Sequence, residues 1–167
     1  MRALDDGLAP LPVHRRDFPY RKEGRRAPDR APKLIATVVE EAEAVAAEHR
    51  VAQRRVILGG RSMGGRMCSM AVAEGLPAAG LVLLSYPLHP PGKPENLRVD
   101  HFPALDLPCL FLAGTKDPFG TPEEVEAHVA AIPGPVTLRW IDGGRHDVKD
   151  HDDEIVSVVE EWIRSLR

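Results

Sequence analysis

Apolar residues recur along the chain in two different spacings, which predicts strands that alternate with helices. Short continuous apolar runs bounded by turn residues are typical of buried strands, whereas apolar residues three and four apart are typical of a helix with one packed face. The runs predict strands at 55–59, 80–84, 109–113 and 136–141, and residues 12–18 look like a weak strand. The helical spacing predicts helices at 32–50, 63–74 and 122–131, and from about residue 152 to the end of the chain.

The predicted helices have recognisable boundaries. Asp29 and the neighbouring prolines mark the start of 32–50, and Thr121 followed by Pro122 is a favoured way to begin a helix. Strands that alternate with helices imply a mainly parallel sheet with helices on both faces. The sequence therefore predicts a three-layer α/β fold in a single domain, residues 1–167, without internal repeats or linkers. The last helix carries one apolar stripe, formed by Ile155, Val158, Val159, Trp162, Ile163 and Leu166.

One glycine-rich segment between a predicted strand and a predicted helix carries candidate chemistry. It reads Gly60-Arg61-Ser62-Met63-Gly64-Gly65, and G-x-S-x-G in this setting is a nucleophile elbow, with the serine in strained dihedrals and its Oγ exposed. Gly60 and Gly64 carry no Cβ, so we expect them to let strand and helix approach closely. The Met63 N–H at the helix N-terminus would point toward an oxyanion on a bound acyl group. The alternative is that Ser62 is an ordinary helix N-cap.

A candidate acid and a candidate base follow in the chain. Asp117 and His146 both lie just beyond predicted parallel strands, where open α/β sheets place functional residues. The order Ser, Asp, His is that of an α/β hydrolase, with His146 as general base and Asp117 orienting its ring. Alternatively, Asp117 only starts a turn before Pro118 and His146 is a solvated loop residue. Asp142 is a rival acid, but it lies too close to His146 in sequence to orient the ring easily.

Composition excludes several other classes of protein. The net charge is −3, from 22 basic and 25 acidic residues, which argues against nucleic-acid binding. No apolar run approaches the length of a membrane span and the N-terminus has no signal-peptide pattern, so we expect a cytoplasmic protein. Cys68 and Cys109 fall on a predicted helix and a predicted buried strand, and we expect reduced packing residues rather than a disulfide. No cofactor is expected.

Three further features of the sequence can each be interpreted in two ways. The segment 15–33 holds eight basic and three acidic side chains, which form either a phosphate or carboxylate site or a solvated basic surface. His146-Asp147 and 151–154 resemble clustered metal ligands, but acids are favoured at a helix start by its dipole and no further ligands follow at a recognisable spacing. No metal is therefore expected. His89 lies either at a pocket mouth or in an ordinary loop.

Taken together, these segments resemble the α/β-hydrolase superfamily, in its dienelactone-hydrolase-like branch. Within that branch the sequence is similar to a small hydrolase-like group that includes a domain of the third subunit of the nonspecific-lethal histone acetyltransferase complex. The resemblance implies the roles of nucleophile, acid and base for Ser62, Asp117 and His146. The named dienelactone hydrolases have cysteine at the elbow, so serine here argues against their substrate. The matching segments, spread from about residue 14 to the end, are 18–20, 24–28, 60–66, 86–93, 114–120 and 144–146.

The resemblance also implies a strand and a His-Gly-rich loop upstream, which these 167 residues do not contain. The chain begins at Met1 in what looks like the helix after that loop, so we expect one oxyanion donor fewer. We also expect either a sheet without a central strand or direct pairing of 12–18 with 55–59. Unpaired strand edges would favour self-association. Two functions are predicted: a serine hydrolase that acts on a small acyl ester or thioester, or a non-catalytic hydrolase-like scaffold.

Overall fold

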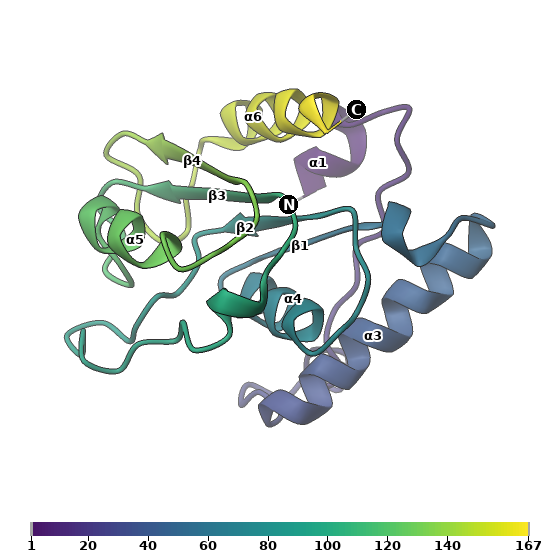
Figure 1. The fold of residues 1–167 in the computed structure, drawn as a ribbon, viewed down its shortest axis with the longest axis horizontal. Helices are drawn as coiled ribbons and strands as arrows, with labels where there is room; N and C mark the ends of the chain where they lie inside the picture. Colours follow the sequence, from purple (N-terminus) through teal and green to yellow (C-terminus); the bar gives the residue numbers. More distant parts are fainter. Residues whose placement is uncertain (1, 167) are drawn as a thin grey trace.

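A parallel sheet lies between two layers of helices in the computed structural model, which describes residues 2–166 (Figure 1). All neighbouring strands pair in parallel and follow each other in chain order, so their carboxyl ends lie at one edge of the sheet. The three-layer α/β prediction is therefore confirmed. The strands are β1 (Ile57–Arg61), β2 (Gly80–Leu84), β3 (Cys109–Gly114) and β4 (Val136–Ile141).

Six α-helices and two short 3₁₀ turns accompany the strands in the described residues. Those predicted from the sequence are present, with ends shifted by one or two residues. The helices are α1 (Arg2–Gly7), α2 (Pro19–Lys22), α3 (Ala31–Glu48), α4 (Met63–Ala73), α5 (Pro122–Val129) and α6 (Asp152–Ser165), and the 3₁₀ turns are η1 (Gln53–Arg55) and η2 (Phe102–Ala104). None of the described helices is both long and apolar enough to cross a membrane.

The two faces of the sheet pack against different helices because successive strand residues point to opposite sides. Leu81 and Leu83 of β2 belong to one core cluster, with residues of α3, α4 and α5. Val82 and Leu84 belong to the other, where α1 and α6 cover the sheet (Figure 1). Trp162 packs in this second cluster, as the apolar stripe of the last helix predicted.

The strand predicted at 12–18 is wrong. These residues form no strand, and in the described part of the chain β1 pairs with β2 alone. The direct pairing with β1 that we considered is therefore also absent. Instead, Val13 packs on the α1–α6 side of the sheet and His14 Nε2 lies 2.6 Å from His49 Nε2 at the end of α3. Pro12 has no N–H to donate to a ladder.

The turn from β1 into α4 depends on a close contact between two backbones. A Cβ on Gly60 would lie 2.7 Å from backbone atoms of Gly64 and Gly65, and a Cβ on Gly65 would lie 2.7 Å from the Gly60 oxygen. A Cβ on Gly64 would meet nothing within 4 Å. The close approach therefore requires Gly60 and Gly65, and our expectation for Gly64 is wrong.

Gly60→Ala and Gly64→Ala form a matched pair that tests this contact. We expect Gly60→Ala to lower the free energy of unfolding by about 2–3 kcal/mol, because the new methyl group meets rigid backbone. Gly64→Ala should leave stability unchanged or raise it slightly, since alanine is the better helix former. Chemical denaturation of both variants measures this. Equal stability losses would contradict the packing described here.

Candidate active site

Ser62 connects β1 to α4 in a backbone conformation that side chains rarely adopt. Its φ is 53° and its ψ is −120°, outside the allowed regions for an ordinary residue. Ser62 does occupy the N-cap position of α4, but its side chain makes no capping hydrogen bond. The strain is therefore not explained by helix capping, and such strain is typical of a functional residue.

The structure brings the side chains of Ser62, His146 and Asp117 together in one hydrogen-bonded chain. His146 Nε2 lies 2.8 Å from Ser62 Oγ, and His146 Nδ1 lies 2.8 and 3.0 Å from the two Asp117 oxygens. Because a carboxylate only accepts, Nδ1 carries the ring proton and Nε2 is left as the acceptor for the serine hydroxyl. This is the arrangement that a general base and its orienting acid need.

Asp117 and His146 are held by contacts that the sequence did not indicate. Asp117 is only 4% exposed, and its Oδ1 accepts a hydrogen bond of 2.9 Å from the Phe119 N–H. The Phe119 ring stacks on the His146 ring, with centroids 4.0 Å apart and planes at 27°. Phe119 therefore fixes both the carboxylate and the imidazole. The segment 114–120 was part of the resemblance, but nothing in its sequence singled out the phenylalanine.

Hydrogen bonds join the loop that carries the acid to the loop that carries the base. The Lys116 N–H donates to the Gly144 carbonyl at 2.9 Å, and the Gly143 N–H donates to Thr115 Oγ1 at 2.8 Å. Thr115 Oγ1 in turn donates to Asp142 Oδ1 at 3.4 Å. The rival acid Asp142 therefore accepts a hydrogen bond from Thr115, and Asp117 is the acid that bonds the ring of His146.

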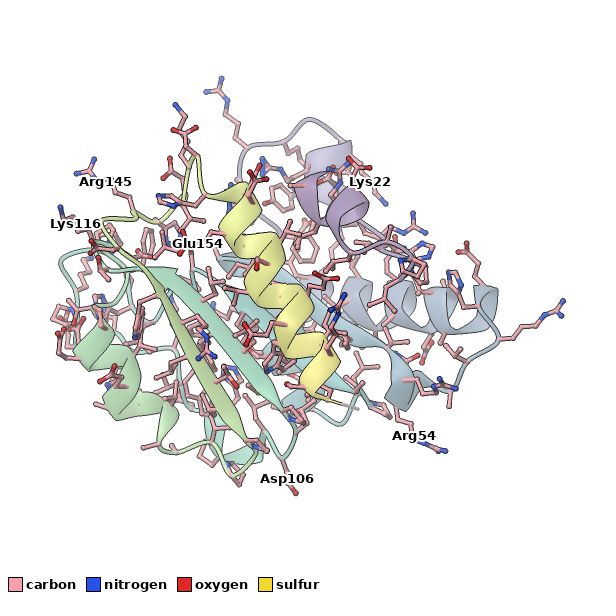
Figure 2. All side chains as sticks on the ribbon, turned by 90° about the horizontal axis from the view of Figure 1, so that it is seen from above. Lys22, Arg54, Asp106, Lys116, Arg145 and Glu154 are labelled. Atoms are coloured by element: carbon pink, nitrogen blue, oxygen red, sulfur yellow. The ribbon has the colours of Figure 1, made fainter. Side chains whose placement is uncertain are left out.

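In Figure 2 the labelled neighbours of two site residues mark one end of the molecule. Arg145 and Lys116, the neighbours of His146 and Asp117, lie together at one end, while Asp106 and Arg54 lie at the other. On the site's side, Arg61 Nη1 donates to the Asp147 carbonyl at 3.0 Å. This bond ties the end of β1 to the loop that follows His146.

A second polar cluster lies next to the elbow and was not predicted from the sequence. The Tyr86 hydroxyl donates to the Arg98 carbonyl at 2.7 Å, and the Ser69 hydroxyl donates to the Arg66 carbonyl at 2.9 Å. His101 Nε2 lies 2.8 Å from Ser69 Oγ, which has already used its only proton, so Nε2 is the protonated nitrogen. We call these five residues the Arg66–Arg98 cluster.

Burial and positive charge set the protonation of this cluster. Burial, and then the charge of Arg66, lower the pKa of His101 to about 4, against a smaller opposing effect of the exposed Asp100. Burial raises the pKa of Tyr86, which the charges of Arg66 and Arg98 partly oppose. Burial and the Arg66 charge lower the pKa of Arg98. At neutral pH the cluster therefore contains two cations, a neutral imidazole and a neutral phenol.

The basic segment 15–33 is largely neutralised within the fold. Arg25 donates to Asp29 at 3.0 Å, and Lys33 lies 3.2 Å from the same carboxylate. Arg16 lies 2.9 Å from Glu41. Asp29 thus pairs with bases instead of capping α3, whose N-cap is Arg30 without a side-chain cap. These ion pairs favour the reading of a solvated basic surface.

His89 and His151 bond neighbouring acids. His89 is buried, which does not fit a pocket mouth; its Nε2 lies 3.3 Å from Glu124 and its Nδ1 bonds the Pro90 carbonyl. His151 lies 3.1 Å from Glu154. Among the described residues the side chains close enough together for metal ligation are His14, Glu48 and His49, away from 146–147 and 151–154, where we expected no metal.

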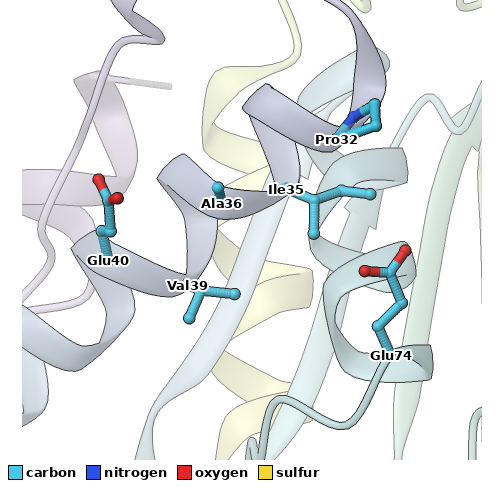
Figure 3. A pocket seen from close by; sticks show the side chains of 6 residues that line it. All are labelled: Pro32, Ile35, Ala36, Val39, Glu40 and Glu74. Atoms are coloured by element: carbon cyan, nitrogen blue, oxygen red, sulfur yellow. The ribbon is translucent and has the colours of Figure 1, made fainter.

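Two cavities lie away from Ser62. A groove of about 470 Å³ runs between α3 and the end of α4, lined by Pro32, Ile35, Ala36, Val39, Glu40 and Glu74 (Figure 3). A second, of about 340 Å³, is lined by Tyr20, Arg21, Gly24, Arg25 and Arg26. Neither is lined by a residue of the Ser62–His146–Asp117 chain, so the chemistry described above belongs to a different surface.

Comparison with known proteins gives the family. The model for the α/β-hydrolase domain matches residues 1–166. The chain belongs to the α/β-hydrolase family.

Cys68 and Cys109 are free and buried in this hydrolase fold, as expected from the sequence. Burial raises the pKa of each thiol to about 12.

Solved structures share the fold at low sequence identity. Est1E from Butyrivibrio proteoclasticus is 17% identical, with a TM-score of 0.68 over 83% of this chain and 71% of that one. The type II thioesterase BorB from the borrelidin biosynthetic cluster is 21% identical, with a TM-score of 0.63 over 89% and 77%. The esterase domain of a Rhodothermus marinus protein is 15% identical, with a TM-score of 0.63 over 78% and 68%.

Asp117→Asn and Asp142→Asn test which acid orients His146. We expect Asp117→Asn to slow labelling of Ser62 by a fluorophosphonate by about 10³–10⁴-fold, because an amide stabilises the wrong imidazole tautomer. Asp142→Asn, which removes a charge from the same pair of loops, should change the labelling rate little. Equal effects of the two substitutions would contradict the assignment of Asp117.

The lowered pKa of His101 predicts a loss of stability in acid. The ring titrates near pH 6.5 in the unfolded chain but near pH 4 in the fold, so below pH 6.5 the unfolded chain gains the proton first. The stabilisation is complete above pH 6.5, is lost as the pH falls to about 4, and changes no further below that. Urea unfolding of wild type and His101→Gln at several pH values measures it. A constant difference between the two proteins from pH 7 to pH 4 would contradict this prediction.

Proposed function

We propose that this protein is a serine hydrolase that cleaves a small carboxylic ester or thioester through an acyl-enzyme. The observation that carries the proposal is the continuous hydrogen-bonded chain from Ser62 Oγ through His146 to Asp117. Membership of the α/β-hydrolase family and the fold shared with esterases and a thioesterase support it. The resemblance to the dienelactone-hydrolase-like branch and to the nonspecific-lethal complex subunit is part of this proposal.

The mechanism follows from the polarity of this hydrogen-bonded chain. Ser62 Oγ attacks the carbonyl carbon while His146 Nε2 accepts the hydroxyl proton. His146 then gives that proton to the leaving alcohol or thiol as the bond to the acyl carbon breaks. A water molecule, deprotonated by His146, attacks the acyl-enzyme and releases the acid, and the proton returns to Ser62. Asp117 stabilises the imidazolium in each half-reaction.

The Met63 N–H is the oxyanion donor that we assign. It belongs to the first residue of α4, where backbone N–H groups have no partner within the helix and the dipole favours negative charge. Each such donor typically contributes about 10²–10³-fold to the rate of acyl transfer. We propose that the substrate is a small acyl compound, neutral or charged, whose carbonyl oxygen reaches the N-terminus of α4.

A non-catalytic scaffold is the second candidate, and one observation favours it. In the described residues the outer edge of β1 has no strand partner, and such an edge can pair with another chain. Self-association through β1 is therefore a proposed property of this protein.

The free, buried cysteines support a reducing compartment such as the cytoplasm.

Hydrolysis of p-nitrophenyl esters and acyl thioesters of short acids tests the proposed function. We expect Ser62→Ala to reduce turnover by at least about 10³-fold, because removal of a triad nucleophile abolishes the acyl-enzyme route. Ser157→Ala, at an exposed position on α6, is the matched control and should retain full activity. Turnover that survives in folded Ser62→Ala would contradict the mechanism. A folded wild type without turnover on any acyl compound would favour the scaffold.

A further inference from the structure

Two arginines next to the elbow lack carboxylate partners among the described residues. Arg66 has no ion pair there, and its Nε is buried without any hydrogen-bond partner. Arg98 has one guanidinium contact, from Nη1 to the Pro87 carbonyl at 3.5 Å. Other arginines, such as Arg25 and Arg16, are neutralised by acids. Arg66 and Arg98 are thus partly buried cations, close enough for the charge of Arg66 to lower the pKa of Arg98. The Arg66 side chain interacts with the neutral Tyr86 but with no carboxylate of the described residues.

A second orphaned group, on Ser85, directly precedes Tyr86 of the cluster in the chain. Ser85 is fully buried, has a positive φ of 47°, and its Oγ has no hydrogen-bond partner. Buried polar atoms in native proteins nearly always have a partner in the protein, in water or in a ligand. The described residues contain three orphaned side-chain atoms, and two of them belong to Arg66 and Ser85. Arg66 lies one helical turn after Ser62, and Ser85 directly follows Leu84, whose carbonyl bonds the Ser62 N–H.

The backbone fixes this cluster against the nucleophile on two sides. The Arg66 N–H donates to the Ser62 carbonyl at 3.1 Å, so the arginine lies one turn after the serine. The Ser62 N–H donates to the carbonyl of Leu84 at 2.8 Å, and Leu84 leads directly into Ser85 and Tyr86. The backbone therefore places Arg66 and the segment that carries Tyr86 beside the nucleophile.

The position of Arg66 is costly unless an anion is bound. Arg66 is the fourth residue of α4, whose first turn contains no acid, and a cation near a helix N-terminus opposes the helix dipole. The neighbouring charge of Arg98 adds to this cost. An anionic oxygen group between the two guanidinium groups would offset both effects, and arginine is well suited to bind one with paired hydrogen bonds.

We propose that Arg66 and Arg98 bind an anionic oxygen group of the substrate, a carboxylate or a phosphate, beside the acyl bond that Ser62 attacks. The proposal rests on the hydrolase function proposed above and narrows its substrate to a negatively charged acyl compound. The charge belongs either to the acyl group, as in the monoester of a dicarboxylic acid, or to the leaving group, as in a phosphorylated thiol. Tyr86, Ser69 and His101 act as positioning residues that hold the two arginines.

Paired substrates separate the two sources of charge. One pair is p-nitrophenyl hemiglutarate and its uncharged methyl ester, and the other is S-acetyl phosphopantetheine and S-acetyl pantetheine. We expect wild type to prefer the charged member of one pair. Arg66→Gln and Arg98→Gln should lower kcat/KM for that member by about 10–100-fold, mainly through KM, as expected for a hydrogen bond to a charged group. The uncharged member should change by less than about threefold, because it makes no such bond.

Two controls separate this effect from a general loss of charge or of fold. Arg145→Gln removes an exposed cation next to His146 and should leave the preference unchanged. Arg98→Lys keeps the charge and should recover part of the loss. Equal turnover of the charged and uncharged members by wild type, or an equal loss on both members in Arg66→Gln, would overturn the proposal.

Direct binding distinguishes failure of this proposal from failure of the hydrolase function. Arginine Nε resonances of the unmodified protein are followed by NMR during titration with glutarate and with inorganic phosphate. We expect saturable shifts of the Arg66 and Arg98 signals with one of these anions, lost in Arg66→Gln and retained in Arg145→Gln. Absence of any shift with both anions overturns the anion site. Saturable binding in a protein without turnover supports the site and rejects the hydrolase.

Discussion

The strained backbone of Ser62 is the constraint on which the rest of the site depends. A serine at φ 53° persists only because the surrounding structure holds it there. Its N–H is bonded to Leu84 on the neighbouring strand and its carbonyl to Arg66 on the helix. Gly60 and Gly65 remove the side chains that would push strand and helix apart. The nucleophile is therefore positioned by the packing of β1 on α4, and the rest of the site is built around it.

A parallel sheet then brings distant residues to the same edge. Because all neighbouring strands are parallel, the loops after β1, β3 and β4 carry Ser62, Asp117 and His146 to the same edge, although β2 and β3 lie between β1 and β4. The sheet alone would align them only roughly. The hydrogen bonds from Lys116 to Gly144 and from Arg61 to Asp147 lock the loops to one another. The stacking of Phe119 on His146 then sets the orientation of the ring.

The sequence predicted what depends on local pattern and missed what depends on distant contacts. The strands β2 and β3 were found because both of their faces are apolar and buried, and the bounds of β2 and β4 were correct. Residues 12–18 were predicted as a strand, but four of the seven side chains are charged or polar and the segment has no strand partner. The choice of Gly65 over Gly64 for the close packing depends on which helical face meets the strand. Phe119 and Arg66 acquire their roles from residues that lie far away in the sequence.

Two unfavourable features meet at the start of α4, and neither contributes to stability. A glycine at the Ser62 position would remove the strain, and an acid at the Arg66 position would suit the helix dipole. Folds usually violate such local preferences at sites of function, where the cost is offset by stable packing elsewhere. The first violation gives a strained nucleophile, and the second gives a partly buried cation one turn away whose Nε has no hydrogen-bond partner in the described protein. A substrate with both an acyl carbon and a negative charge would use the two features together, which explains why they occupy the same turn.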